Sequence, residues 1–207
     1  MAVTLRKPET GRVIILNGPP RSGKSSTAQA LQEINEVPMV TLGVDAAMAA
    51  TPPSLLPGIG LRPGGERPDL EPFIQANYGA LFDSIAAHAR QGLDVVADLG
   101  IHDSYSRPLG IWSDAAQRLD GLATHVIGLR CSLEVVLERR AAHPDRYATA
   151  DGCQVPPAVV RWDEAVHTPG WYDLEVDTSE LSPGDCATMI VNELAGRVPC
   201  ALGRHRS

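Results

Sequence analysis

Residues 13–25 read VIILNGPPRSGKS, and this stretch decides the fold. Its first four residues form an apolar run that predicts a buried strand, and residues 18–25 have the spacing G-x-x-x-x-G-K-[ST] of a phosphate-binding loop. A helical pattern over 26–34 follows directly. Because the loop ends at a helix N-terminus, backbone N–H groups and the positive end of the helix dipole can face phosphate oxygens. The order of strand, loop and helix predicts a nucleotide-binding α/β domain.

The residue types within the loop suit a nucleoside triphosphate. Gly18 and Gly23 permit close approach of the backbone to phosphate, Lys24 would reach the β- and γ-phosphates, and the Ser25 hydroxyl would ligate Mg²⁺. The alternative is an ordinary Gly-rich turn, but a chain of this composition matches the pattern by chance in roughly two of a thousand cases. The predicted nucleotide-binding residues of the loop are Gly18, Pro19, Pro20, Arg21, Ser22, Gly23, Lys24, Ser25 and Ser26.

Other apolar runs and helical patterns alternate along the rest of the chain. Runs rich in Val, Ile and Leu predict four more buried strands, at 39–44, 93–97, 125–129 and 172–176. Helical patterns occupy 73–91, the stretch between the cap Ser132 and Pro144, the stretch from 156 through 164, and about 183–194. This alternation predicts one three-layer α/β domain over 1–207, in which a five-stranded, mainly parallel sheet has helices on both faces.

Two stretches, 51–72 and 143–156, fit no regular element, and we expect both to be loops. Long loops in a compact domain are usually functional or disordered. We therefore expect an acceptor-binding segment at about 46–72 and a lid at about 139–156.

The formal net charge of −7 and the pI near 5.3 argue against a partner that is nucleic acid or anionic membrane, because both would repel the chain. No window approaches the roughly 18 apolar residues of a membrane span, and the first residues lack the apolar stretch of a signal peptide, so we expect a cytoplasmic location. The four cysteines are widely separated, which predicts reduced thiols rather than a zinc site or disulfides. They are Cys131, Cys153, Cys186 and Cys200.

Carboxylates follow two predicted strands at the sheet edge where the phosphate loop lies. Asp45 comes directly after the run 39–44, where a base for an acceptor hydroxyl is needed. The alternative is an N-cap for a helix over 46–50. Asp98 ends the run 93–97 and resembles the acid that holds Mg²⁺ beside such loops. Asp103 is its rival for this role, and loop capping is the structural alternative.

Arg139, Arg140 and Arg146 flank the point where a helix gives way to the predicted lid. In an acidic chain, such a cluster can fold over ATP and neutralise charge that develops on the transferred phosphate. The alternative is that these arginines pair with acidic neighbours such as Glu134 and Glu138 on a solvated helix face.

The two lysines bear on the class of nucleotide-binding protein. A GTPase normally reads guanine through Asn/Thr-Lys-x-Asp, but Lys7 precedes the phosphate loop and Lys24 lies within it, so no lysine remains for that motif. Motor and transporter ATPases usually need larger chains. A length of 207 residues with five strands matches the small kinases, by analogy of fold.

The chain resembles the chloramphenicol phosphotransferase family, a branch of P-loop kinases related in fold to nucleotide and shikimate kinases. The resemblance covers most of the chain and rests on 13–18 leading into the loop, on Leu42-Gly43-Val44-Asp45, on Arg130-Cys131 followed by Glu138-Arg139 and Asp145-Arg146, and on 172–178. It implies phosphorylation of an alcohol by ATP, with Asp45 as general base, Arg139 and Arg146 as lid arginines, and Thr178 in a loop near adenine.

We therefore expect an ATP- and Mg²⁺-dependent O-phosphotransferase that acts on a small hydroxylated acceptor, with antibiotic inactivation as the leading role. A metabolic or nucleotide-sugar kinase is the alternative enzyme, and a nucleotide-binding regulator without transfer is the alternative from another class. Phe73, Tyr78, Tyr105 and Trp112 could line an aromatic pocket, although apolar residues at helical spacing are more often core residues. The sequence leaves the acceptor and the oligomeric state open, a homo-oligomer included.

Overall fold

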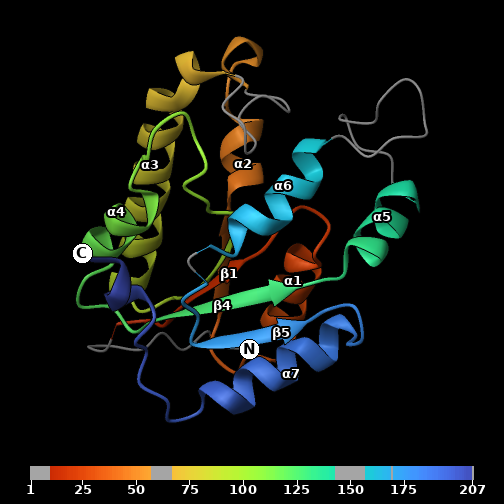
Figure 1. The fold of residues 1–207 in the computed structure, drawn as a ribbon. Helices are drawn as coiled ribbons and strands as arrows, with labels where there is room; N and C mark the ends of the chain where they lie inside the picture. Colours follow the sequence, from red (N-terminus) through yellow and green to blue (C-terminus); the bar gives the residue numbers. More distant parts are fainter. Residues whose placement is uncertain (1–9, 57–66, 143–156, 169, 207) are drawn as a thin grey trace.

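The computed structural model describes residues 10–56, 67–142, 157–168 and 170–206. A sheet of five strands forms its centre (Figure 1). These strands are β1 (Val13–Asn17), β2 (Met39–Gly43), β3 (Asp94–Leu99), β4 (Thr124–Arg130) and β5 (Leu174–Asp177). They lie in the order β2-β3-β1-β4-β5, and every neighbouring pair is parallel. The five predicted strands are confirmed, with ends that shift by one or two residues.

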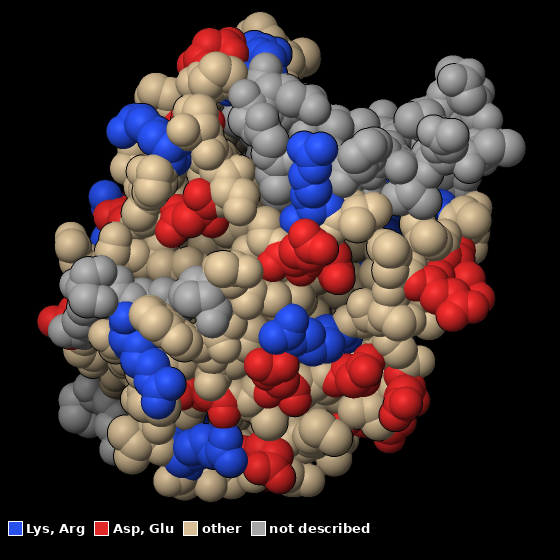
Figure 2. All heavy atoms as spheres, viewed as in Figure 1, with Lys and Arg blue, Asp and Glu red and all other residues tan. Residues whose placement is uncertain are grey.

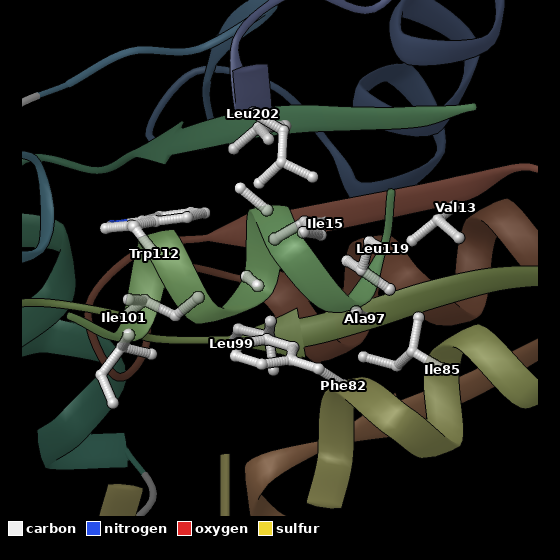
Figure 3. Packing of buried hydrophobic residues seen from close by; sticks show 14 of the residues in the cluster. Val13, Ile15, Phe82, Ile85, Ala97, Leu99, Ile101, Trp112, Leu119 and Leu202 are labelled. Carbon is white, nitrogen blue, oxygen red and sulfur yellow. The ribbon is translucent and has the colours of Figure 1, made fainter. Parts of the chain in front are cut away.

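Helices cover both faces of the sheet. Figure 1 shows α3 (Glu71–Arg90) and α4 (Ile111–Arg118) on one side, and α1 (Lys24–Ile34) and α7 (Pro183–Leu194) on the other. Successive residues of β1 point to opposite faces. Val13 and Ile15 therefore pack with α3 and α4, as Figure 3 shows, while Ile14 and Leu16 pack with α1 and α7. Burial of both faces explains why the strand reads as an unbroken apolar run, and the three-layer α/β fold is confirmed.

Shorter elements lie at the carboxyl edge of the sheet and at the end of the chain. They are α2 (Val44–Ala49), α5 (Leu133–Ala142), α6 (Pro157–Val166) and the 3₁₀ turns η1 (Pro53–Leu55), η3 (Pro68–Leu70) and η4 (Leu202–Arg206). The predicted cap of α5 is confirmed, because the backbone N–H of Val135 donates to Ser132 Oγ at 3.3 Å.

The expectation that 51–72 contains no regular element is wrong in part. This stretch includes η1 and η3, and α3 begins at Glu71, two residues before its predicted start. All three elements have Pro in their first two positions, where the fixed φ of proline suits a helical turn and the missing N–H is not needed. Residues 57–66 of this stretch lie outside the described residues, as does the whole second predicted loop, 143–156.

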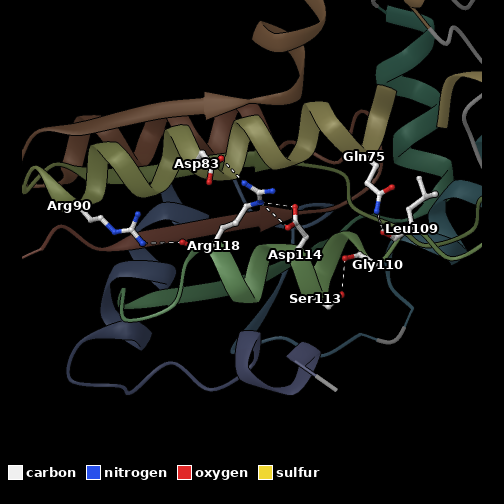
Figure 4. Close-up of polar contacts among 8 residues, drawn as sticks. All are labelled: Gln75, Asp83, Arg90, Leu109, Gly110, Ser113, Asp114 and Arg118. Atoms are coloured by element: carbon white, nitrogen blue, oxygen red, sulfur yellow. Dashed lines mark hydrogen bonds and ion pairs between the residues drawn. The ribbon is translucent and has the colours of Figure 1, made fainter. Parts of the chain in front are cut away.

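Helix α4 was not predicted, because eight residues are too few to show a sustained helical period. Polar contacts hold it against α3 (Figure 4). Arg118 Nε donates to both carboxylate oxygens of Asp114, at 2.8 and 2.9 Å, and its Nη1 donates to Asp83 Oδ2 at 2.5 Å. Gln75 Nε2 also donates to the carbonyl oxygen of Leu109 at 2.8 Å. These contacts hold the end of the loop that connects β3 to α4, and this loop passes the site.

The described residues show no preassembled cluster of three or more metal-binding side chains, and none of their helices has the length and apolar character of a membrane span. Cys131, Cys186 and Cys200 are free thiols, and Cys153 lies outside the described residues. Acidic and basic side chains are interspersed on the face seen in Figure 2.

Candidate active site

A pocket of about 830 Å³ opens where the carboxyl ends of the strands meet the phosphate loop. Its volume lies in the range of small-molecule and cofactor sites. The predicted site residues that line it are Gly18, Pro20, Arg21, Gly23, Lys24, Ser25, Ser26, Asp45, Asp98, Arg139 and Thr178. Pro19 and Ser22 are buried and do not line the pocket, and Arg146 lies outside the described residues. The structure thus brings most of the predicted site together.

The phosphate loop has the backbone that an anion requires. A Cβ at Gly18 would lie 2.6 Å from Ser22 Oγ and 2.7 Å from the carbonyl oxygen of Leu129, so only glycine fits there. Gly23 has a left-handed φ of 84° and caps α1 without a side-chain hydrogen bond, which leaves the first N–H groups of the helix to a ligand. Ser22 Oγ is buried without a hydrogen-bond partner in the described part of the chain. A buried hydroxyl in this state is destabilising unless a ligand satisfies it.

Lys24, Ser25 and Asp98 form the polar centre of the pocket. Ser25 Oγ donates to Asp98 Oδ2 at 2.5 Å, and Lys24 Nζ lies 4.0 Å from Asp98 Oδ1. Lys24 Nζ also donates to the carbonyl oxygen of Pro19 at 2.8 Å. Burial lowers the pKa of Lys24, and the charges of Asp98 and Asp45 oppose that shift. Hydroxyl and carboxylate oxygens are the ligands that Mg²⁺ prefers, and phosphates supply the rest in such sites, so the pair Ser25 and Asp98 fits this ion.

Asp45 is the second residue of α2, and Gly43 occupies the N-cap position. The alternative that Asp45 caps this helix is therefore wrong. The carboxylate is exposed in the pocket, and among the described residues it has neither a hydrogen bond nor an ion pair. A carboxylate that makes neither a hydrogen bond nor an ion pair with the described residues is available to accept a proton.

Asp103, the rival of Asp98 in the sequence, is exposed and does not line the pocket. Asp98 instead pairs in register with Gly43 at the end of β2, next to the start of α2. Of the two carboxylates, only Asp98 lies beside the hydroxyl of the phosphate loop.

Arg139 connects the phosphate loop to the end of β5. Its Nη2 donates to the carbonyl oxygen of Thr178 at 2.6 Å, and its Nη1 donates to the carbonyl oxygen of Arg21 at 3.2 Å. Thr178 Oγ1 donates to the carbonyl oxygen of Ser22 at 2.8 Å. The guanidinium thus contacts the backbone of the loop, and Arg139 also lines the pocket. Arg140, half-buried on the same helix, does not line the pocket.

The pocket has two sides, named here after the edge strands of the sheet. The β5 side is lined by Thr27, Arg139, Thr178, Leu181, Pro183 and Cys186. The β2 side is lined by Val44, Asp45, Ala47, Met48, Ile74, Asn77, Tyr78, Leu81, Gly100, His102, Tyr105 and Trp162. The order of the strands places the phosphate loop, which follows β1, between the two sides.

The aromatic prediction is half right. Tyr78 and Tyr105 line the β2 side, whereas Trp112, on α4, is buried in the core and Phe73 is not part of the lining. His102 and Trp162 were missed. His102 follows β3 at the sheet edge where functional side chains gather, and this position was a usable signal. No local pattern reveals that α6 brings Trp162 into the pocket.

Asn17, the last residue of β1, lies directly before the phosphate loop, and its role was not predicted from the sequence. Its side chain is buried, and its Oδ1 accepts from the backbone N–H of Ile101 at 2.7 Å. Its Nδ2 donates to the carbonyl oxygen of Val166 at 2.9 Å and lies 3.4 Å from the hydroxyl of Tyr172. Asn17 therefore connects the phosphate loop to the loop after β3 and to the end of α6.

Comparison with known proteins bears on this site. A model of the family described as "Chloramphenicol phosphotransferase-like protein" matches residues 11–195. Two Mycobacterium tuberculosis proteins, from strains CDC 1551 and H37Rv, carry the name "putative O-phosphotransferase". Each is 27% identical to this chain over 184 residues, which span 82% of this chain and 76% of the relative.

Solved structures with a similar fold include P-loop kinases. The M. tuberculosis APS kinase, in complex with AMPPNP and APS, has a TM-score of 0.64 at 16% identity and covers 91% of this chain and 99% of its own. The shikimate kinase of Acinetobacter baumannii, in complex with shikimate, has a TM-score of 0.59 at 18% identity and covers 91% and 95%. At these identities the likeness shows the fold alone, which is that of a P-loop kinase.

Proposed function

Because the chain belongs to the chloramphenicol phosphotransferase-like family, we propose that it is an ATP- and Mg²⁺-dependent O-phosphotransferase. Its acceptor is a small molecule with a hydroxyl group, and a hydroxylated antibiotic such as chloramphenicol is the first candidate. One observation carries this proposal: a single pocket contains the phosphate loop, the Ser25–Asp98 pair and the unpartnered carboxylate of Asp45.

The strand order supports one substrate on each side of the pocket. Thr178 follows β5, so the β5 side receives the base of the nucleotide. Asp45 follows β2, so the β2 side receives the acceptor. The phosphate loop between them supports the triphosphate, with Lys24 on the β- and γ-phosphates. The γ-phosphate then faces the β2 side.

Transfer needs a base on the acceptor side and positive charge over the phosphate. Asp45 takes the proton of the acceptor hydroxyl while that oxygen forms a bond to the γ-phosphorus and the bond from the γ-phosphorus to the bridging oxygen breaks. ADP leaves with the electron pair, and the proton on Asp45 passes to solvent. Ser25 and Asp98 would hold Mg²⁺, which neutralises charge on the phosphates.

Of the cations that line the described pocket, Lys24 and Arg139 are the ones we assign to this step. Burial lowers the pKa of Lys24, and the charge of a bound triphosphate would raise this pKa again. Arg139 donates to the backbone of the loop at Arg21, and its contact with the γ-phosphate, like that of Arg146, stays a proposal.

The test is phosphoryl transfer by Asp45→Asn, with Asp103→Asn as the matched control on an exposed carboxylate outside the pocket. Each variant is incubated with ATP, Mg²⁺ and a panel of hydroxylated antibiotics and metabolites, and mass spectrometry detects the added phosphate. Asp45→Asn should bind ATP as the parent does but transfer at least about 100-fold more slowly. A parent protein that binds ATP yet phosphorylates no member of the panel would indicate a nucleotide-binding regulator instead.

A further inference from the structure

His102 is a buried histidine on the β2 side of the pocket, and it has no role in the transfer step described above. Only 2% of its surface is exposed. Tyr105 stacks on the ring with centroids 4.4 Å apart, and Trp162 meets it edge-on at 5.8 Å. Packing from two directions holds the imidazole in one orientation.

A hydrogen bond fixes the tautomer of this ring. The backbone N–H of Ser104 donates to His102 Nδ1 at 3.2 Å, so Nδ1 carries the lone pair. Burial lowers the pKa of His102 to about 4, which keeps the ring neutral at pH 7. The single proton therefore resides on Nε2.

Nε2 of His102 is left for a ligand. Among the described residues, this nitrogen has no hydrogen-bond partner. It is also absent from the set of fully buried polar atoms that lack a partner, so it is not completely enclosed by protein. Because His102 lines the pocket, its Nε2–H group is presented to whatever fills the β2 side.

The charge around this donor limits the ligand's chemistry. The cations that line the pocket, as far as the chain is described, are Arg21, Lys24 and Arg139, and all three lie at or beyond the phosphate loop. The β2 side instead contains the carboxylate of Asp45. It also contains two phenols, Tyr78 and Tyr105, whose pKa values are raised by burial, so both stay neutral. Desolvating a negative group of the acceptor there is unfavourable, because the described part of the β2 side offers it no counter-charge.

We propose that His102 is a specificity-determining residue that donates its Nε2–H to an uncharged oxygen of the acceptor, distinct from the hydroxyl that receives phosphate. This inference rests on the proposed kinase function. The acceptor is then an uncharged molecule with at least two oxygen groups, one placed at Asp45 and the other at His102. Its apolar part packs against Tyr105 and Trp162.

Two substitutions separate this role from a structural one. Gln at position 102 presents an N–H group near the former Nε2 but loses the acceptor at Nδ1. Asn at position 102 presents an acceptor near the former Nδ1, which keeps the bond from Ser104, but loses the distal donor. A residue that only holds Ser104 would therefore tolerate Asn better than Gln, and a residue that binds the acceptor would tolerate Gln better than Asn.

The experiment measures steady-state transfer by the parent, His102→Gln and His102→Asn with ATP, Mg²⁺ and four probes: chloramphenicol, uridine, methyl glucoside and the carboxylate shikimate. We expect the parent to prefer an uncharged probe. For that probe, His102→Asn should raise KM about 3- to 10-fold, because the acceptor loses one neutral hydrogen bond. The kcat and the KM for ATP should stay within about twofold of the parent's values. His102→Gln should raise the KM for the probe by less than His102→Asn does, because Gln keeps a donor near the former Nε2.

The possible results are distinguishable. A parent that transfers phosphate to none of the probes overturns the proposed function, and this inference with it. A parent that prefers shikimate overturns the uncharged acceptor. Transfer with unchanged KM in both variants, or a larger KM in His102→Gln than in His102→Asn, overturns the role of His102 alone. Thermal melts of the three proteins identify a variant that is misfolded, and the KM for ATP reports whether the nucleotide side is intact.

Discussion

The side chain of Asn17 donates to the carbonyl oxygen of Val166 at 2.9 Å, across 149 residues of sequence. The same amide accepts from the backbone N–H of Ile101 at 2.7 Å. One residue directly before the phosphate loop thus holds two of the pocket's walls, namely the loop that carries His102 and the helix that carries Trp162. The geometry of the β2 side depends on this buried amide.

Asn17→Leu should destabilise the protein by about 2–3 kcal/mol, because it leaves a buried N–H and a buried carbonyl oxygen without partners. Urea unfolding followed by circular dichroism measures this change. Asn192→Leu, on the exposed face of α7, is the control and should stay within about 0.5 kcal/mol of the parent. Equal stability of the two variants would show that the Asn17 bonds contribute nothing net.

Gly18→Ala should abolish nucleotide binding even where the protein remains folded. The added Cβ would lie 2.7 Å from the carbonyl oxygen of Leu129, and backbone atoms of the central sheet cannot yield easily. Calorimetric titration with ATP and Mg²⁺ is the measurement. Gly184→Ala is the control, since a Cβ there meets nothing closer than Ser182 Oγ at 3.9 Å and should leave ATP affinity unchanged. Normal ATP affinity in Gly18→Ala would contradict the fit of the phosphate loop.

Asp98→Asn should raise the Mg²⁺ concentration for half-maximal transfer about 10-fold or more, because the carboxylate that partners Ser25 loses its charge. Transfer rates across a magnesium titration test this effect. Asp103→Asn should leave the titration unchanged, since Asp103 does not line the pocket. The reverse pattern would assign the metal to Asp103.

Prediction from sequence succeeded where the determinant is local. The spacing of Gly18, Gly23 and Lys24 predicted a phosphate loop between a strand and a helix. In the structure this loop connects β1 to α1 and lines the pocket. Asp45 and Asp98 were found because functional side chains gather at the carboxyl ends of parallel strands. Both carboxylates do line the pocket, although their chemical roles stay predictions.

Prediction failed where a contact joins distant parts of the chain. Neither the bond between Asn17 and Val166 nor the position of Trp162 has any local signal, since both depend on how α6 returns to the sheet. In helix α3, the sequence also did not show which aromatic residue lines the pocket. Phe73 and Tyr78 are both half-buried on that helix, yet only Tyr78 lines the pocket, and the periodic pattern alone does not say which one.

The burial of His102 should make folding sensitive to acid. Its pKa is lowered from 6.5 to about 4 by burial, so between these values the unfolded chain binds more protons than the folded one. Stability therefore rises with pH across this window: the contribution is complete above pH 6.5 and is lost as pH falls toward 4. A shift of this size corresponds to a loss of up to about 3 kcal/mol. Urea unfolding of the parent and His102→Gln at pH 7.5 and pH 4.5 isolates this residue, since all other titrating groups are common to both proteins. The parent should lose more stability than the variant, and equal losses would mean that the imidazole is not held neutral in the fold.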